Sequence, residues 1–364
     1  MPGPLAGVRV IDLTRLYPGP YATLLLGDLG ADVVKVEDAA EGDLLRGLPE
    51  QFEALNRGKR SIAIDLKARE GPAVLRRLCA RADVLVEGFR PGVLERLGCA
   101  PAALAAELPR LVICSLTGFG QTGPLRDRAG HDIGYLALSG VLSRCGLGEV
   151  PALPGAQIAD FLAGGLQAVV AVLAALVERA STGRGRLLDV AMTEGSMQAL
   201  LPRLADPSSE DVLRGDRPCY RVYACSGGGA VALGALEPKF WERFCAAVGR
   251  PDWEAQQFDP SLCPAVDEMF LGRTRDEWAA LLGPADCCAE SVLWIEELPA
   301  HPQHRARSLW LGDGRPRSLP ALVDTASLPA GRAPAHGEHG ADVLREAGAS
   351  EAEISALRGA GVVR

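Results

Sequence analysis

The sequence predicts an α/β protein whose first third forms a Rossmann-like parallel sheet. Short apolar segments typical of buried strands alternate there with segments typical of helices. A strand, a helix and a second strand in succession usually form a parallel pair, so the alternation indicates a parallel sheet with helices on its faces. The polar, turn-rich segment 204–218 then predicts a linker into a smaller α+β region.

The elements of the first region follow in a regular order. The first strand is expected at 8–13, a helix begins at Pro20 and is closed by Gly30, and the second strand covers 31–37. An apolar segment at 161–180 predicts a helix that is buried on all sides. The remaining predicted elements are a strand at 61–66, a helix at 71–82, a strand at 84–86, a helix at 91–97, a strand at 111–116 and a strand at 187–192 that leads into a helix.

The second region has a different pattern. Strands are expected at 221–224 and 230–233, and helices from Glu237 onward. A segment at 311–340, rich in proline, glycine and arginine, is expected to return over the surface before a last amphipathic helix that begins near Ala341 or Ser350.

Composition excludes several classes of protein. With 364 residues and a net charge of -8, the chain is long enough for two domains and lacks the basic surface of a general nucleic-acid binder. We find no uninterrupted apolar stretch of the roughly 20 residues that cross a bilayer and no signal-peptide pattern, so we expect a cytoplasmic protein with no membrane partner. The ten cysteines include no CxxC pair, which indicates reduced, mostly buried thiols and no metal.

A histidine and an aspartate are the strongest candidates for catalysis. His131, in Gly-His-Asp-Ile-Gly-Tyr, and Asp160 both follow glycine-containing turns and precede small or apolar stretches. Together they could supply a neutral imidazole and a carboxylate to one pocket, which is the minimum needed to take a proton from one face of a carbon and return it to the other. The alternative interpretation of Asp160 is an N-cap of the helix that follows.

Basic residues near predicted strand ends are candidates for binding an anionic ligand. They are the run Asn56-Arg57-Gly58-Lys59-Arg60, then Lys67 and Arg90. A dinucleotide is a poor candidate for that ligand, although Glu37 ends the second strand where a ribose-binding acid would stand. The first turn, 14–20, contains no GxGxxG and provides no close approach to a pyrophosphate.

Several motifs in order make the chain resemble the family III CoA-transferases of the CaiB/BaiF type, and within them the α-methylacyl-CoA racemase branch. The motifs include Pro-Leu-Ala-Gly-Val-Arg-Val at 4–10, Asn-Arg-Gly-Lys-Arg-Ser at 56–61, Glu-Gly-Phe-Arg-Pro-Gly at 87–92, Thr-Gly-Phe-Gly-Gln-Thr-Gly-Pro at 117–124, Gly-His-Asp at 130–132 and Thr-Gly-Arg-Gly at 182–185. The similarity extends over nearly the full length.

The resemblance implies a domain layout and a quaternary structure. A large Rossmann-like domain that binds CoA would comprise 1–203 and a C-terminal return at 319–364, and a small α+β domain with its linker would comprise 204–318. Two subunits would interlock as a homodimer, with each active site between the large domain of one subunit and the small domain of the other. The fold class expected is therefore α/β with both chain ends in one domain.

The resemblance also assigns roles to residues. His131 and Asp160 would be the two bases of a racemase, and Glu237 would reach the catalytic histidine from the small domain, although Glu237 can also be read as a residue at a helix start favoured by the helix dipole. CoA is part of the substrate, and no separate cofactor is expected. The residues matched to acyl-CoA binding are Arg60, Ile64, Asp65, Leu66, Lys67, Arg90, Gly130, Asp132 and Tyr135.

Three functions stay open at this point. A racemase or epimerase of 2-methylacyl-CoA thioesters, an enzyme of lipid metabolism, is favoured by His131, because the transferases commonly carry a non-basic residue there. In a CoA-transferase, Asp160 would instead form an aspartyl-acyl anhydride and then an aspartyl-CoA thioester. A thioester-binding protein without chemistry is suggested by two departures from the family pattern, which are Asp38 in place of an arginine and an unusual linker at 204–218. A third departure, Gly134 in place of an asparagine, leaves the choice of substrate open.

Overall fold

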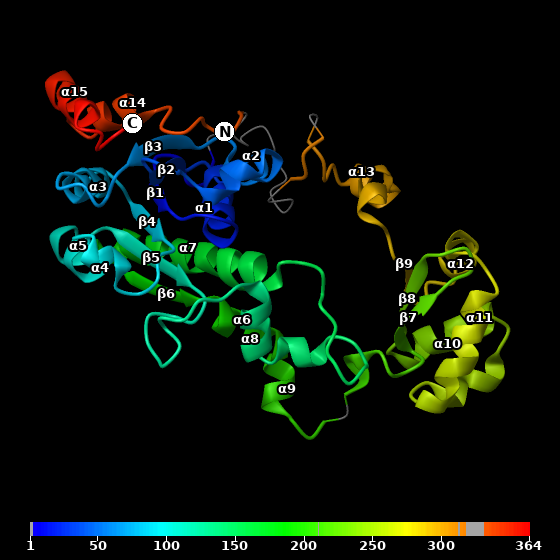
Figure 1. Ribbon diagram of the computed structural model, residues 1–364. Coiled ribbons are helices and arrows are strands. Elements are labelled where there is room, and N and C mark those ends of the chain that lie inside the picture. Colours follow the sequence, from blue (N-terminus) through cyan, green and yellow to red (C-terminus); the bar gives the residue numbers. More distant parts are fainter. Residues whose placement is uncertain (1–2, 210, 312–313, 318–330) are drawn as a thin grey trace. The chain divides into compact units, whose positions relative to one another are not determined.

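The computed structural model describes residues 3–209, 211–311, 314–317 and 331–364. These residues form two compact units (Figure 1). Unit 1 comprises 1–141, 155–200 and 315–364, and unit 2 comprises 142–154 and 201–314. The return of the chain to unit 1 at Arg315 brings both chain ends into the same unit. Residues 142–154 belong to unit 2, although no pattern in the sequence predicted it.

A six-stranded, fully parallel sheet forms the centre of unit 1, in the order β3-β2-β1-β4-β5-β6. This is the order of a Rossmann-like doubly wound sheet, and it confirms the predicted fold class. Each predicted strand is present, and its ends differ from the predicted ends by at most two residues. The strands are β1 (Arg9–Leu13), β2 (Asp32–Asp38), β3 (Arg60–Ile64), β4 (Val84–Glu87), β5 (Val112–Thr117) and β6 (Leu187–Ala191).

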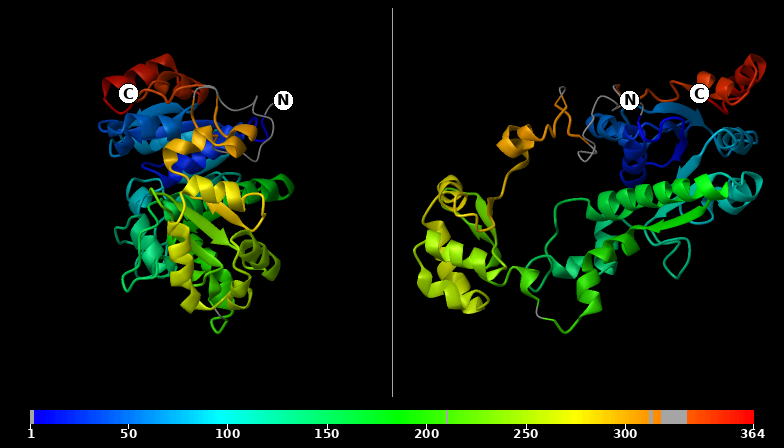
Figure 2. Two further views of the ribbon diagram at one scale, coloured as in Figure 1. Left: turned by 90° about the vertical axis from the view of Figure 1, so that its right-hand side faces the viewer. Right: turned by 180° about the vertical axis from the view of Figure 1, so that it is seen from behind.

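Helices cover both faces of this sheet. Alternate side chains such as Ile11, Val34 and Ile62 pack in one core with α3 (Gly71–Cys79), α4 (Val93–Arg96), α5 (Pro101–Glu107), α14 (Gly340–Glu346) and α15 (Glu351–Gly359). Because successive side chains of a strand point to opposite faces, the intervening residues face α1 (Pro18–Asp28) and α7 (Gln167–Thr182). Helix α14 lies beside β3, which places the C-terminal helices at that edge of the sheet (Figures 1 and 2).

The remaining elements of unit 1 lie in the connections between strands. Helix α2 joins β2 to β3, α6 lies between β5 and α7, and α8 follows β6. A π-helix, η3, precedes α7 without a break. Their bounds are α2 (Pro49–Asn56), α6 (Asp132–Leu138), η3 (Ile158–Leu166) and α8 (Met192–Met197).

Unit 2 is a small α+β unit, in agreement with the strands predicted after the linker. Its antiparallel sheet has the order β7-β8-β9, and aromatic side chains including Trp241, Phe244 and Phe270 fill its core. The elements are α9 (Leu201–Ala205), β7 (Tyr220–Ala224), β8 (Ala230–Gly234), α10 (Pro238–Ala247), α11 (Cys263–Leu271), α12 (Arg275–Leu282), β9 (Ala289–Ser291) and α13 (Pro302–Ala306).

A helix is present over the apolar segment 161–180, as predicted, but the expectation that it is buried on all sides was wrong. The continuous helix Ile158–Thr182 is long and apolar enough to cross a membrane by length and composition alone, although one such helix is weak evidence and this one is the crossover between two strands of the sheet. The helix is not buried on all sides, because Leu162, Val170 and Val177 are 56%, 56% and 74% exposed.

The ten cysteines are free thiols, and only Cys145 and Cys288 are not buried. Within the ranges that the structure describes, no group of three or more histidine, cysteine, aspartate and glutamate residues is arranged to hold a metal ion.

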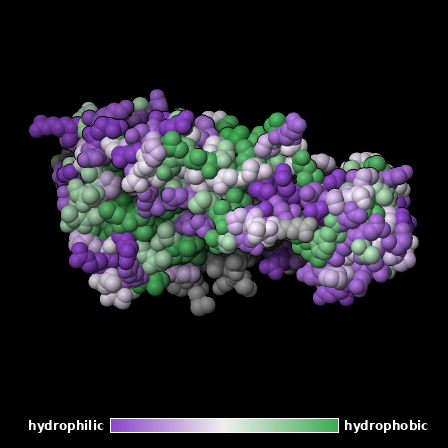
Figure 3. All heavy atoms as spheres, turned by 90° about the horizontal axis from the view of Figure 1, so that it is seen from below, coloured by the Kyte–Doolittle hydropathy of each residue, from purple (hydrophilic) through white to green (hydrophobic). Residues whose placement is uncertain are grey.

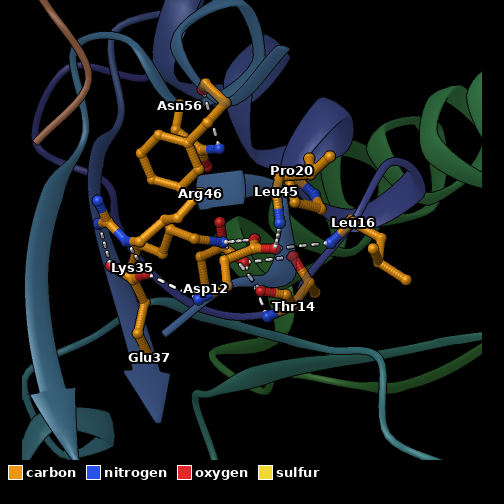
Figure 4. A network of polar contacts seen from close by, with 12 residues as sticks. Asp12, Thr14, Leu16, Pro20, Lys35, Glu37, Leu45, Arg46 and Asn56 are labelled. Carbon is orange, nitrogen blue, oxygen red and sulfur yellow. Dashed lines mark hydrogen bonds and ion pairs between the residues drawn. The ribbon is translucent and has the colours of Figure 1, made fainter. Parts of the chain in front are cut away.

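A buried network of charged side chains lies between β1, β2 and α1 (Figure 4). The ammonium of Lys59 contacts Asp12 at 3.1 Å, the carbonyl of Pro20 at 3.0 Å and the hydroxyl of Thr23 at 2.8 Å. Burial alone would raise the pKa of Asp12, but Lys59 and Lys35 outweigh it and hold that pKa far below its usual value. Burial lowers the pKa of Lys59 to about 8, against the attraction of Asp12.

The second half of the network holds the loop between β1 and α1. Lys35 forms a 2.8 Å ion pair with Asp43 and donates a 2.9 Å hydrogen bond to the carbonyl of Thr14. The other oxygen of Asp43 accepts from the backbone N–H of Leu16, which has a left-handed backbone with φ of 66° that a leucine seldom adopts. The loop is therefore fixed by charges that are themselves fully buried.

Removing one charge from this network is expected to destabilise the folded protein. The substitution Lys59→Met leaves the Asp12 carboxylate buried with one cation fewer, which should lower the free energy of unfolding by about 3 kcal/mol or more. Urea denaturation followed by circular dichroism measures this change. As a control, Glu178→Gln removes the exposed ion pair with Arg186, and it should change the free energy of unfolding far less, because solvent screens an exposed pair. Equal losses for the two variants would contradict the expectation.

Candidate active site

His131 is the residue immediately before α6, with an extended backbone and an exposed side chain. The loop that carries it is shaped around Tyr135, whose ring lies edge-on against Phe119 with centroids 5.2 Å apart. A Cβ atom at Gly118 or Gly130 would lie 2.2 or 2.5 Å from that ring, so only glycine fits at either position. The predicted Gly-His-Asp motif therefore owes its glycine to the packing of Tyr135.

Asp160 is the third residue of the π-helix η3 and is half-buried. Its interpretation as an N-cap was wrong, because Gln157 occupies that position. Two glycines allow the helix to pack closely: a Cβ atom at Gly164 would lie 2.6 Å from the side chain of Met192, and one at Gly165 would lie 2.7 Å from the ring of Tyr21. π-helical turns are uncommon and are frequently found at functional sites.

Asp132 joins the elements that carry the two candidate bases. Its carboxylate is buried at the start of α6 and accepts a 2.9 Å hydrogen bond from the backbone N–H of Asp160. This bond ties α6 to η3 and brings His131 and Asp160 into the same site. The bond also uses the backbone N–H of Asp160. This N–H is therefore not available to donate a hydrogen bond to a negatively charged oxygen of a ligand.

The electrostatics of the site favour proton transfer. Burial, and then the negative charge of Asp132, raise the pKa of Asp160 to about 6, while the positive charge of His131 acts in the opposite direction. Burial, and then Asp160, raise the pKa of Tyr135 to about 12, with Arg90 opposing. A carboxyl group that titrates near neutral pH beside an imidazole is suited to general acid and base catalysis.

The raised pKa of Asp160 has a consequence for stability. Because the folded-state pKa lies above the ordinary value, ionisation of Asp160 costs stability, and this cost is absent below about pH 4 and complete above about pH 6. Asp160→Asn should therefore raise the free energy of unfolding by about 1–2 kcal/mol near pH 7.5 and leave it unchanged near pH 4. Denaturation at the two pH values measures the difference, and an equal effect at both would show that the charge is not the cause.

A pocket of about 250 Å³ lies at the carboxyl ends of the first four strands. Of the residues predicted to bind acyl-CoA, Ile64, Leu66 and Lys67 line it. Asp65 lies in the same turn, where its carboxylate accepts hydrogen bonds from the N–H groups of Lys67 and Ala68. The other lining residues are Leu13, Thr14, Arg15, Val36, Glu37, Asp38, Gly42, Asp43, Phe89, Val93 and Leu97.

The predicted residues thus fall into groups. Gly130, Asp132, Tyr135 and Arg90 belong to the site of His131 and Asp160, whereas Ile64, Leu66 and Lys67 line the pocket and Asp65 lies in the turn beside it. Arg60 belongs to neither group, since it lies at the amino end of β3, where its guanidinium pairs with Asp32 and Glu346 at 2.6 and 2.9 Å. Glu237 lies in unit 2, where it is the exposed residue that precedes α10, and its side chain does not cap that helix.

Most of the basic run at 56–60 serves the fold. Arg57 is buried and donates two hydrogen bonds to the carboxylate of Asp28, at 2.7 and 2.6 Å, and Lys59 is the centre of the buried network. Lys67 and Arg90 are the exposed cations among the candidates.

Sequence reasoning missed the pocket residues Thr14, Arg15 and Phe89 and the anchoring role of Asp132. A usable signal existed for the first three, because they follow directly on strands β1 and β4, and ligands in parallel sheets bind at the carboxyl ends of strands. The hydrogen bond between Asp132 and Asp160 joins residues 28 apart, and their sequence gave no signal for it.

The fold is that of a Rossmann-like α/β protein, and its candidate site holds an exposed histidine near a half-buried aspartate whose pKa is raised. The model of the family "CoA-transferase family III" matches residues 5–340, and this chain belongs to that family. A mouse protein named alpha-methylacyl-CoA racemase is 40% identical over 97% of this chain and 96% of its own length. A formyl-CoA:oxalate CoA-transferase of Rhodopseudomonas palustris is 30% identical over 99% of this chain and 97% of its own.

A solved structure agrees with the fold. The crystal structure of a CaiB/BaiF family protein from Brucella suis has a TM-score of 0.82 with this chain, at 29% identity, and the match covers 95% of this chain and all of the other. The predicted family is therefore confirmed, and with it the fold class.

Proposed function

We propose that this chain is a racemase of 2-methylacyl-CoA thioesters. The observation that carries the proposal is that the hydrogen bond from Asp160 to Asp132 holds Asp160 near enough to His131 for the two to interact electrostatically, while burial raises the pKa of Asp160 to about 6. The name of the mouse relative, at 40% identity over nearly the whole of both chains, supports the same substrate class and reaction. An acyl-CoA thioester is then the substrate, and the reaction consumes no second substrate.

The proposed mechanism uses the two groups as acid and base in turn. One of them removes the proton on the carbon next to the thioester carbonyl, and the electron pair of the broken C–H bond forms an enolate. The conjugate acid of the other group then returns a proton to the opposite face, and the thioester bond stays intact. His131 accepts the proton from one enantiomer and Asp160 from the other.

Exchange of the α-hydrogen with solvent tests this proposal directly. With 2-methyldecanoyl-CoA in deuterium oxide and no acceptor acid, proton NMR should show loss of the α-proton signal. His131→Ala and Asp160→Ala should each lower the racemisation rate at least about a hundredfold, because each removes one of the two bases. Below about pH 6 the rate from the enantiomer that uses Asp160 as base should fall about tenfold per pH unit.

The matched control is Asp127→Ala, which removes an exposed carboxylate from the same loop as His131 and should leave the exchange rate unchanged. If no exchange occurs in the wild type, the racemase proposal fails. Trapping of an acyl group on Asp160 by hydroxylamine would then favour a CoA-transferase, the function named for the Rhodopseudomonas relative. The absence of both would leave a thioester-binding protein.

A homodimer forms part of the proposal. Large apolar side chains are exposed along α6 and the helix 158–182, and they include Ile133, Leu138, Leu162, Leu166, Val170 and Val177. Hydrophobic surface is also visible on the face of unit 1 in Figure 3. Exposed apolar area of this kind is typical of an interface, and a second copy of the chain would cover it. In the interlocked arrangement, Glu237 of one subunit would complete the site of the other.

Co-expression of two inactive variants tests whether Glu237 acts in trans. If each site takes His131 from one subunit and Glu237 from the other, a mixed dimer of one His131→Ala subunit and one Glu237→Gln subunit has one site with both residues intact. Its other site lacks both residues. Such dimers, purified with two different affinity tags, should recover about half of the wild-type activity per dimer. If His131 and Glu237 act within one subunit, both sites of the mixed dimer stay defective and no activity returns.

A further inference from the structure

The pocket at the carboxyl ends of the strands has a mixed lining. Its walls are apolar, with side chains such as Val36, Ile64 and Phe89, and its polar residues come from the ends of β1, β2 and β3. With a volume of about 250 Å³ it is slightly smaller than a site for a whole drug-sized ligand, so it suits one part of a longer molecule, such as a nucleoside.

Two of the three carboxylates in this lining are already neutralised. Glu37 is buried. Its carboxylate accepts two 2.7 Å hydrogen bonds from the guanidinium of Arg46 and one of 2.7 Å from the hydroxyl of Ser61. Asp43 is buried and paired with Lys35 at 2.8 Å. Glu37 is therefore not available as the ribose-binding acid that its position at the end of β2 first suggested.

Asp38, the next residue, is exposed and lines the pocket. Its Oδ1 atom accepts hydrogen bonds of 2.9 and 3.0 Å from the N–H groups of Ala40 and Glu41, which fixes the direction of the carboxylate. Among the described residues, no hydrogen bond or ion pair uses its second oxygen. The end of β2 thus presents one oriented carboxylate whose remaining oxygen is open to a ligand.

The cations around the pocket leave this carboxylate in place. Lys67 and His336 lie near enough to Asp38 to lower its pKa, after the larger effect of the Glu41 N–H, so that Asp38 is ionised at neutral pH. Lys67 and Arg15 are exposed in the lining and form no ion pair within the described ranges. They are suited to the diphosphate of a nucleotide, whereas Asp38 is suited to hydroxyl groups.

An acid at the end of the second strand of a Rossmann-like sheet recognises ribose hydroxyls, and a cation at the same place accommodates a phosphate on the ribose. We propose that Asp38 is a specificity residue that makes this site favour thioesters of 3′-dephospho-CoA, with a free ribose 3′-hydroxyl, over those of CoA. A 3′-phosphate would bring its charge close to the carboxylate. The inference rests on the proposed function in taking a CoA-type thioester as the ligand.

Calorimetric titration with CoA and with 3′-dephospho-CoA tests this selectivity without any turnover. The two probes differ only in the 3′-phosphate. The wild-type protein should bind 3′-dephospho-CoA at least as tightly as CoA. Asp38→Asn keeps an oxygen for the N–H groups of Ala40 and Glu41 but removes the charge, so it should shift the ratio of the two Kd values toward CoA by about fivefold or more.

The matched control is Glu41→Gln, which removes an exposed charge from the same turn at a residue outside the pocket lining. It should shift the ratio by less than about twofold. The proposal is overturned if the wild type binds CoA more tightly than 3′-dephospho-CoA, if the two variants shift the ratio equally, or if neither probe binds. Deuterium exchange at the α-carbon would still decide the proposed function in each of these cases.

Discussion

The structure of unit 1 depends on the buried ion network between Asp12, Lys59, Lys35 and Asp43. Charges that are removed from water are stable only when each has a partner, so this network permits few arrangements of the β1–α1 loop. Lys35 holds the carbonyl of Thr14, and Asp43 holds the N–H of Leu16. The strained backbone at Leu16 persists because both neighbours are fixed in this way.

This loop connects the two parts of the functional region. On one side, Thr14 and Arg15 line the pocket at the strand ends. On the other, Tyr17 of the loop and Tyr21 in the first turn of α1 contact the ring of Phe161, with centroids 5.9 and 4.9 Å away, and Phe161 is the residue after Asp160. A long thioester that occupies both places would therefore lie along a loop whose shape is set by buried charges.

The environment of Asp160 follows from packing as much as from charge. The π-helix η3 contacts α1 and α8 closely because Gly164 and Gly165 have no side chains. Burial is the largest cause of the raised pKa, and the buried Asp132 adds to it. The desolvation that lowers stability at neutral pH also brings the pKa of this carboxyl group close to neutral pH, which the proposed proton transfer requires.

The sequence by itself determined the parallel α/β architecture and the family, because strand and helix periodicities and short motifs are local properties of the chain. It also supplied His131 and Asp160 as a candidate pair. Only the tertiary structure decided the hydrogen bond from Asp160 to Asp132, the burial of Arg57 and Lys59, the position of Arg60 away from the pocket, and the exposed apolar residues of the helix 158–182. These features depend on contacts between residues far apart in the chain, and residue type alone does not specify such contacts.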